Sequence, residues 1–265
     1  MNEPVKVLTI AGSDSGGAAG LQADLKTWAA LGMYGMSVVS VVTAQNSMAV
    51  TAVHPLPLDF VAAELDAVLT DYGAAAVKTG FLGRVDLIQT IAAKLSLYQL
   101  CNIVIDPVLV NHKGQAMFSP EVTQAYIDHL LPLADLITPN RREAELLTGL
   151  SVQSVMEMET AVIHLHAFGP KYVLLKGGRD GDELVDLFYD GTAVTQFRSP
   201  RIDTINTHGS GDTLSAAVCA FLAQGMGMET AVYKAHQFTH QAIQRAASWQ
   251  LGHGHGPVAP YKPQH

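Results

Sequence analysis

The sequence is short of cysteine and of positive charge, and each shortage excludes a class of protein. Only two cysteines occur among 265 residues, Cys101 and Cys219, and they form neither a CxxC pair nor a Cys/His cluster. This excludes a disulfide-rich scaffold and a zinc ribbon, and it favours a reducing, cytoplasmic compartment. Lys and Arg number 16 against 24 Asp and Glu, without any basic run, so the net charge is −8. Such a chain is a poor partner for nucleic acid or for an anionic membrane.

Long apolar stretches are missing as well. No run of eighteen apolar residues occurs, and the five-residue apolar run near the N-terminus is shorter than the core of a signal peptide. We therefore expect a soluble protein without a membrane segment or a cleaved leader. Hydrophobic residues nevertheless make up 48% of the sequence and charged residues 15%. That balance exceeds what a disordered chain carries and indicates a folded globular protein.

Short β-branched runs alternate with longer segments of helical spacing. The predicted strands are 5–10, 36–42, 74–79, 101–106, 134–138 and 171–178. The predicted helices include 21–32, 58–69, 85–95, 119–131, 210–224 and 228–248. A "DG" at 190–191 joins the runs 183–190 and 192–199 in a hairpin. This order predicts an α/β fold with a mainly parallel sheet and a late β-hairpin. Because no linker or repeat divides the chain, we expect a single domain over residues 1–265, with an irregular tail from about residue 252.

A glycine-rich loop, Gly12 to Gly20, follows the first predicted strand, yet it carries neither known phosphate-binding signature. The pattern GxxxxGK[ST] fails at Ala18, and GxGxxG is absent. A flexible turn that eases helix–strand packing and a ligand-binding loop are therefore equally open. Asp24 comes in the first turns of the next helix, where surface capping is the alternative to a functional role.

Polar residues follow several predicted strands, and ligands of open parallel sheets bind beyond the carboxyl ends of the strands. Gln45 and Asn46 follow the second strand, where an amide either pairs with a heterocycle edge or closes a turn. Asp106 is held at a strand end by the rigid Asp-Pro dipeptide, a good position beside a metal or a phosphate. Lys176 precedes two glycines, and such a charged strand end suits a phosphate contact.

Two further pairs are candidate ligand sets. Asn140 and Glu143 lie three apart at a predicted helix start, either as a functional pair on one face or as a helix cap with an acidic first turn. His236 and His240 lie four apart on a predicted helix and form half a metal site at most, because no HExxH motif or third ligand accompanies them.

The stretch Gly209-Ser210-Gly211 leads directly into an apolar helical run. Unpaired N–H groups at a helix N-terminus form an anion hole. Asp212 then either caps the helix or accepts a proton from a hydroxyl held against the hole, and the stretch alone does not choose. A hydrolase with Ser210 as nucleophile and His208 as base is weaker, because the local order H-G-S-G-D lacks GxSxG.

Taken together, seven blocks resemble the hydroxymethylpyrimidine and phosphomethylpyrimidine kinases of thiamine biosynthesis, within the ribokinase superfamily. The blocks are "AGSDSGGAAGLQADLKT", "TAQNS", "KTGFLG", "DPVLV", "TPNRREAE", "LLKGG" and "NTHGSGDTLSAA". They span residues 5 to about 257 in the order of the family. The resemblance implies a three-layer ribokinase-like fold, with helices on both faces of a central, mostly parallel sheet. Bacterial pyridoxal kinases share most blocks, so a pyridoxal/pyridoxine kinase of vitamin B6 salvage is the alternative.

The resemblance also implies a role for each matching residue. The residues lining the pyrimidine pocket would be Gly12, Asp24, Thr43, Gln45 and Phe81. Asp106 and Glu143 would surround magnesium and its waters together with Asn140, which also lies on the ATP side. Lys176 would contact the ATP phosphates, Gly209, Ser210 and Gly211 would form the anion hole, and Asp212 would be the catalytic base. Residues 107–117 would form a mobile segment over the site.

The family also implies partners and a reaction. ATP, Mg²⁺ and a pyrimidine alcohol would bind, a monovalent-cation requirement stays open, and family members often pair as homodimers. The expected reaction is phosphoryl transfer from MgATP to the alcohol, and then to its monophosphate. The loop Gly12–Gly20 would hold the first phosphate with backbone donors. A sensor that lost its chemistry is the non-enzymatic alternative, against which the intact acid, lysine and glycine set argues.

Three positions depart from the family. Asp212 stands where the thiamine branch usually has a cysteine, although aspartate is the general choice of the superfamily. A carboxylate is already ionised at neutral pH, so it can accept the hydroxyl proton directly. Ala18 replaces a frequent glycine, which stiffens the first loop. The segment "VLVNHKG" (108–114) lacks the cysteine of some pyridoxal kinases, and this favours the pyrimidine substrate.

Overall fold

The computed structural model describes residues 3–111 and 113–261. By its internal contacts the chain divides into two compact units, Met1–Leu82 with Ile202–His265 as the first and Gly83–Arg201 as the second. The single domain expected over residues 1–265 stays a prediction. His112, within the predicted mobile segment, and residues 262–265, at the end of the predicted tail, lie outside the described residues.

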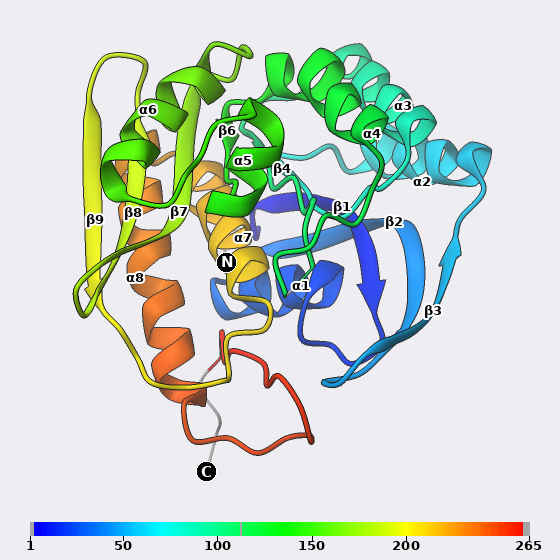
Figure 1. The fold of residues 1–265 in the computed structure, drawn as a ribbon. Coiled ribbons are helices and arrows are strands. Elements are labelled where there is room, and N and C mark those ends of the chain that lie inside the picture. Colours follow the sequence, from blue (N-terminus) through cyan, green and yellow to red (C-terminus); the bar gives the residue numbers. More distant parts are fainter. Residues whose placement is uncertain (1–2, 112, 262–265) are drawn as a thin grey trace. The chain divides into compact units, whose positions relative to one another are not determined.

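Four strands of the first unit lie in the order β3-β2-β1-β4 (Figure 1). They are β1 (Lys6–Asp14), β2 (Tyr34–Gln45), β3 (Val50–Pro55) and β4 (Ala76–Thr79). β1 pairs in parallel with β2 and β4, whereas β3 runs antiparallel to β2. β1 and β4 are buried almost throughout, as parallel strands covered on both faces are. The sequence missed β3, because every one of its residues is exposed and its "VTAVHP" run shows no alternation.

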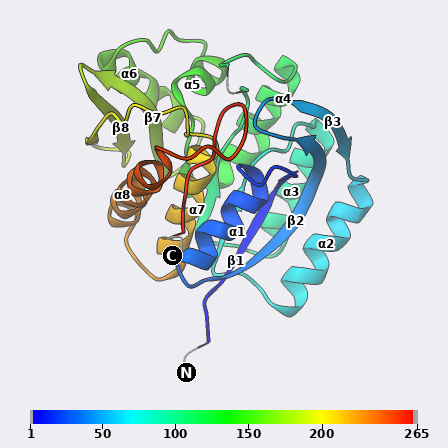
Figure 2. The same cartoon turned by 90° about the horizontal axis from the view of Figure 1, so that it is seen from below.

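The helices of the first unit are α1 (Gly20–Ala30), α2 (Leu58–Asp71), α7 (Ser210–Ala223) and α8 (Met228–Ala246). α7 packs between α1 and α8 and also contacts β1 and β4; Figures 1 and 2 show α7 beside α8. The small side chains of 215–217 and 219–220 in α7 are buried and allow this close approach. Trp28 of α1 adds a hydrogen bond, since its Nε1 donates to the Ala216 carbonyl at 2.8 Å. These contacts hold the buried middle of α7 at the centre of the unit.

Strands of the second unit lie in the order β5-β6-β7-β8-β9. Their bounds are β5 (Ile103–Ile105), β6 (Leu136–Ile137), β7 (Tyr172–Asp180), β8 (Glu183–Tyr189) and β9 (Val194–Pro200). β5, β6 and β7 are parallel, and β7, β8 and β9 are antiparallel neighbours. The predicted hairpin at 190–191 is confirmed: Asp190 Oδ1 accepts the N–H groups of Thr192 and Ala193, both at 2.8 Å.

The second unit also contains α3 (Val85–Leu97), α4 (Pro120–Ala125), α5 (Arg141–Thr148) and α6 (Val155–His166). The helix expected over 119–131 is α4, then a π-helical turn (Tyr126–Leu130) and a 3₁₀ turn (Leu131–Leu133) that includes Pro132. Proline lacks a backbone donor, so Pro132 is tolerated in the first positions of the 3₁₀ turn but would interrupt a continuing α-helix. α6 has no counterpart among the predicted elements, although Ser154 and Glu157 form a capping box at its start. None of the helices in the described part of the chain has the length and apolarity that a membrane crossing requires.

Candidate active site

Residues predicted for the pyrimidine pocket gather in the first unit, at the carboxyl ends of its parallel strands. Gly12 lies near the end of β1, where a Cβ would stand 2.8 Å from Val41 Cγ1 and 3.6 Å from Phe81 Cβ. Phe81 follows β4, and its carbonyl accepts the Ser40 hydroxyl at 2.6 Å. Gly12 therefore lets the backbone of β1 approach the Val41 side chain of β2, and a larger residue there would displace that neighbour.

Thr43 and Gln45 project from the end of β2 beside the first loop. The Thr43 hydroxyl donates to the Ser13 carbonyl at 2.9 Å, and Ser15 Oγ bonds both the N–H and the carbonyl of Gln45 at 2.8 Å. The Gln45 amide is half-buried, and its Nε2 lies 3.5 Å from His208 Nε2. These contacts fix the backbone of Gln45 while its amide stays at the surface of the unit.

Asp24 and Asp212 are joined through a lysine that the sequence reasoning missed. Lys78 Nζ lies 2.6 Å from Asp24 Oδ1 and 3.1 Å from Asp212 Oδ1. The Thr9 hydroxyl donates to the other Asp24 oxygen at 2.6 Å. Asp24 and Lys78 are fully buried, so the surface-capping alternative for Asp24 is wrong. Burial raises the pKa of Asp24 to about 7, against the opposing effect of Lys78 and with a smaller contribution from Asp212. The available signal for Lys78 was a lysine inside the apolar strand run "AAAVKT".

The predicted anion-hole stretch forms the start of α7, but the Ser210 N–H donates to the Thr207 carbonyl at 3.1 Å, so this predicted donor of the hole is already engaged. Gly209 is the N-cap residue, with a left-handed backbone at φ 78°, and a Cβ there would stand 1.8 Å from the Ala18 carbonyl oxygen. The N–H groups of Gly211 and Asp212 lie in the first helical turn, where the helix offers them no partner. The Asp212 carboxylate turns to Lys78, and no side chain caps α7. Of the two alternatives for Asp212, the cap is therefore wrong.

The serine-hydrolase alternative finds no support in the described residues. The His208 ring stacks on His255, with centroids 5.2 Å apart, and its Nε2 faces Gln45. Within the part of the chain that the structure covers, the Ser210 hydroxyl makes no hydrogen bond to His208. A nucleophile needs its base within hydrogen-bond reach, and this pair does not provide it.

The first loop corrects a prediction. Asp14 Oδ1 accepts the N–H group of Gly16 at 2.8 Å, and Asp14 Oδ2 accepts those of Ala18 and Ala19 at 2.9 Å. The Gly17 N–H donates to the Asp14 carbonyl. The loop is an anion-binding nest, but its own carboxylate fills it, so these backbone donors are not available to a substrate phosphate. No local pattern predicts that Asp14 accepts these N–H groups, because an aspartate in a glycine-rich loop has many possible partners.

The last described residues of the tail form backbone hydrogen bonds to two segments beside this site. The His208 N–H donates to the Gly256 carbonyl at 3.0 Å, and the His255 N–H donates to the Ser47 carbonyl at 2.9 Å. A Cβ on Gly256 would stand 1.8 Å from Asn206 Oδ1. The tail lacks helix and strand over the residues described after 251, as predicted, yet it is fixed against the turn that precedes α7.

Four of the residues predicted for ATP and magnesium, Asp106, Asn140, Glu143 and Lys176, lie in the second unit, whereas Gly209, Ser210 and Gly211 belong to the first. Lys176 Nζ lies 3.0 Å from Asp106 Oδ1, and Asn140 forms a bridge to the backbone of Lys176. A register shift between Leu175 and Gly178 interrupts β7 at this lysine. Burial raises the pKa of Glu143 to about 7, Lys176 opposes this, and nearby Asp106 adds to it. The structure thus brings together the four residues that the sequence had placed on different strand ends.

Asn140 and Glu143 also form the helix cap that the sequence left open. Asn140 Oδ1 accepts the N–H groups of Arg142 and Glu143, and Glu143 Oε2 accepts the Asn140 N–H at 2.8 Å. Glu143 Oε1 accepts the Leu109 N–H at 3.1 Å. Both Glu143 oxygens are therefore engaged in backbone hydrogen bonds, which fix the start of α5 and the segment after β5.

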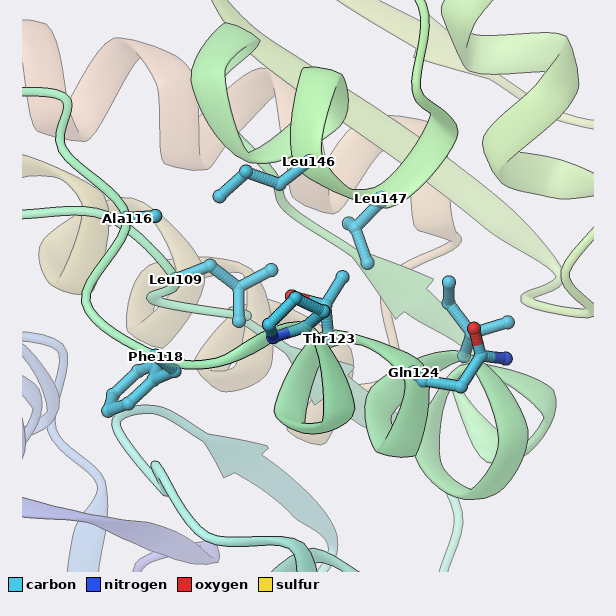
Figure 3. A pocket seen from close by; sticks show the side chains of 9 residues that line it. Leu109, Ala116, Phe118, Thr123, Gln124, Leu146 and Leu147 are labelled. Carbon is cyan, nitrogen blue, oxygen red and sulfur yellow. The ribbon is translucent and has the colours of Figure 1, made fainter.

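Residues 107–117 include a short antiparallel bridge between Val110 and Ala116. A cavity of about 350 Å³ lies between this segment, α4 and α5 (Figure 3). Leu109 and Ala116 line one side and Leu146 and Leu147 of α5 line another. The lining is mostly apolar, and the mobility of the segment stays a prediction.

His236 and His240 lie one turn apart on α8. No group of three His, Cys, Asp or Glu side chains suited to a metal ion occurs among residues 3–111 and 113–261. The cluster of Asp106 and Glu143 supplies two carboxylates, so a metal there would take further ligands from water or phosphate.

Comparison with known proteins decides the family. The sequence pattern of the phosphomethylpyrimidine kinase family matches residues 14–259. The chain belongs to the phosphomethylpyrimidine kinase family. The resemblance inferred from the seven blocks is thereby confirmed.

Named relatives of this family are similar over nearly the whole chain. A hydroxymethylpyrimidine/phosphomethylpyrimidine kinase of Rhizobium meliloti is 45% identical over 95% of this chain and 95% of its own length. A bifunctional thiamine biosynthesis protein of Geobacter sulfurreducens is 46% identical over 95% of this chain. This chain spans only about half, 51%, of that bifunctional protein.

A solved structure shows the same fold. The ADP complex of Bacillus subtilis pyridoxal kinase has 40% sequence identity and a TM-score of 0.91, with 97% of each chain covered. The predicted fold class, a ribokinase-like α/β fold with a mostly parallel sheet, is therefore confirmed. The pyridoxal kinase also shows that fold alone does not separate the two substrates of the phosphomethylpyrimidine kinase family and its neighbours.

Proposed function

We propose that this chain is an ATP-dependent kinase of thiamine biosynthesis. It phosphorylates the hydroxymethyl group of 4-amino-5-hydroxymethyl-2-methylpyrimidine and then the resulting monophosphate. The observation that carries the proposal is the Asp212 carboxylate, 16% exposed, beside unpartnered N–H groups at the start of α7. The family match over residues 14–259 and the activity for which the relatives are named support it.

In the first step Asp212 accepts the proton of the substrate hydroxymethyl group. The alkoxide oxygen forms a bond to the γ-phosphorus of ATP, and the bond from that phosphorus to the bridging oxygen breaks to release ADP. The N–H groups of Gly211 and Asp212 stabilise the charge on the moving phosphoryl group. Gln45 orients the ring, because an amide donates to a ring nitrogen and accepts from an amino group at once.

The nucleotide side of the reaction belongs to Lys176, Asn140, Asp106 and Glu143. Asp106 and Glu143 are hard oxygen donors buried close together, and their mutual repulsion contributes to the raised pKa of Glu143. A divalent cation would offset that excess charge, so the donor set fits Mg²⁺. Because both Glu143 oxygens accept backbone hydrogen bonds, Glu143 would reach the ion through water. Bound Mg²⁺ supplies neutralising charge to the ATP phosphates, and Lys176 adds a point charge on the same side.

The pyrimidine is the proposed acceptor and pyridoxal the alternative. The curated relatives described above carry the pyrimidine activity in their names, and the segment 108–114 lacks the cysteine of some pyridoxal kinases. Purified protein is incubated with MgATP and either hydroxymethylpyrimidine or pyridoxal, and ADP release is measured. Mass spectrometry then separates the pyrimidine monophosphate from the diphosphate. ADP release with the pyrimidine and formation of both products supports the proposal, and release with pyridoxal alone would replace it with the alternative.

A homodimer and a cytoplasmic location complete the proposal, both on the basis of family likeness and cysteine usage. Analytical ultracentrifugation gives the mass in solution, and a mass of one chain, 28.2 kDa, would contradict the dimer. The same ADP assay with potassium or sodium salts tests whether a monovalent cation is required.

A further inference from the structure

Lys78 is a fully buried charged group beside the proposed base. Its side chain has no solvent exposure, and it lies in the last part of β4, facing both α1 and α7. A buried ammonium is stable only where hydrogen-bonded anions compensate it. Asp24 and Asp212 are those anions, at 2.6 and 3.1 Å. We refer to Thr9, Asp24, Lys78 and Asp212 as the Lys78 cluster.

The cluster is asymmetric. Asp24 is fully buried and both its oxygens accept bonds from inside the protein, one from Lys78 and one from Thr9. Asp212 is 16% exposed and is the only member that reaches the surface of the unit. Lys78 therefore has the fully buried Asp24 carboxyl group behind it and the partly exposed Asp212 carboxylate in front of it. Such a clamp restrains the Asp212 carboxylate through one oxygen, Oδ1, and leaves Oδ2 to face a bound hydroxyl.

From this geometry we propose that Lys78 is a positioning residue for phosphoryl transfer, which holds the Asp212 carboxylate toward the acceptor hydroxyl. The inference rests on the proposed function and deepens it. A carboxylate must be turned about its side-chain bonds to present one oxygen, and an adjacent fixed cation both turns it and stabilises its charge.

Cys219 of α7 is a further titratable group beside the Lys78 cluster. It is buried near Asp24 and Lys78, and burial raises the pKa of its thiol, so it stays neutral. Among residues 3–111 and 113–261, Lys78 forms ion pairs with Asp24 of α1 and Asp212 of α7, and Thr9 of β1 adds a hydroxyl. Two carboxylates and one ammonium leave one negative charge in excess, which the raised pKa of Asp24 relieves by protonation near neutral pH.

The test removes the ammonium and follows the catalytic constants. Lys78→Met is expected to lower kcat on the order of 100-fold, as a misplaced reacting group does, with little change in KM or in the Kd for ADP. In the Asp212→Asn background the same substitution is expected to change kcat by less than about 3-fold, because residues that act as a unit are not additive. Lys6→Met, an exposed lysine on β1 of the same unit, is the matched control and is expected to match the parent.

Lys78→Met leaves two buried carboxylates without a cation, so a charge-balanced variant keeps the test informative if it does not fold. Asp24→Asn/Lys78→Met removes one charge of each sign. It is expected to fold and to keep the low kcat, because the Asp212 carboxylate still lacks the ammonium that orients it. A purely structural lysine would change the amount of active enzyme and leave the kcat of the folded enzyme unchanged.

The outcomes separate this inference from the proposed function. If the parent protein releases no ADP with the pyrimidine, the proposed function fails. If the parent is active and the folded Lys78→Met variant keeps a kcat within about 3-fold of the parent value, the proposed role of Lys78 is refuted while the proposed function stands. An equal loss of kcat in the parent and Asp212→Asn backgrounds would also refute it, since Lys78 would then act independently of Asp212.

Discussion

At the scale of the residue, Asp212 is the side chain on which the proposed chemistry depends. Asp212→Asn keeps the size of the side chain but removes the ionised oxygen that accepts the hydroxyl proton. We expect kcat to fall by about 10²- to 10⁴-fold, the usual contribution of a general base, while the Kd for ADP changes little. Steady-state kinetics with hydroxymethylpyrimidine and calorimetric titration with ADP measure the two quantities. Near-parent turnover would remove Asp212 from the base role.

Asp24 makes the stability of the protein depend on pH. Its carboxyl has a pKa of about 7 in the folded chain against 3.8 for a solvated aspartate, so the folded state holds an extra proton between these values. The free energy of unfolding therefore falls as pH rises from about 4 through 7, as far as Asp24 contributes to it. We expect Asp24→Asn to lose less stability than the parent between pH 5 and pH 8 in urea unfolding. Equal losses in both proteins would contradict the raised pKa.

At the scale of the element, the turn into α7 requires glycine for two separate reasons. Gly209 has φ 78°, and a Cβ would collide with the Ala18 carbonyl oxygen at 1.8 Å. Gly225, at φ 85° with nothing within 4 Å of a Cβ, shares only the first constraint. We expect Gly225→Ala to cost about 1 kcal/mol of stability from the backbone alone, and Gly209→Ala to cost clearly more. Thermal unfolding compares the two, and equal costs would show that the turn yields without strain.

The first loop depends on its own carboxylate. Asp14 accepts three N–H groups of the loop, so Asp14→Ala leaves those donors without their acceptor. We expect a loss of about 2 kcal/mol or more, because each buried donor without a partner costs about 1–3 kcal/mol. Asp14→Asn keeps one acceptor oxygen, so its free energy of unfolding is expected to lie between those of the parent and Asp14→Ala. Unfolding in urea measures all three proteins, and an unchanged Asp14→Ala variant would show that water replaces the carboxylate.

At the scale of the whole molecule, nucleotide binding is expected to stabilise the folded state. A ligand present at 100 times its Kd adds about 2.7 kcal/mol, so ADP with Mg²⁺ should raise the melting temperature in a concentration-dependent way. Lys176→Met removes the positive charge beside Asp106 and is expected to reduce this shift. Lys171→Met removes an exposed lysine of the same unit and provides the control. An equal shift in both variants would place the nucleotide away from Lys176.

Much of the fold and of the candidate site could be predicted because the signals were local. Buried parallel strands such as β1 and β7 are β-branched runs, and the polar residues that follow strands necessarily gather at the same edge of a sheet. The strand β3 was not predicted, because an exposed edge strand needs no apolar alternation. The contacts of Lys78 and Asp14 could not be predicted for another reason. Both side chains meet their partners through tertiary contacts that no local pattern specifies.

The sequence by itself determined the α/β class, the order of most strands and helices, the seven blocks of the family and the residues at the strand ends. These follow from hydrophobic period and from motif spacing, which the chain carries locally. Only the tertiary structure decided that Asp212 turns to Lys78 rather than capping α7, and that Asp14 fills the first loop. A carboxylate can satisfy its charge with several partners, and which partner it takes depends on distances between segments far apart in the chain. The turn before α7 shows both: its glycines are visible in the sequence, whereas the partner of Asp212 is set by the tertiary structure.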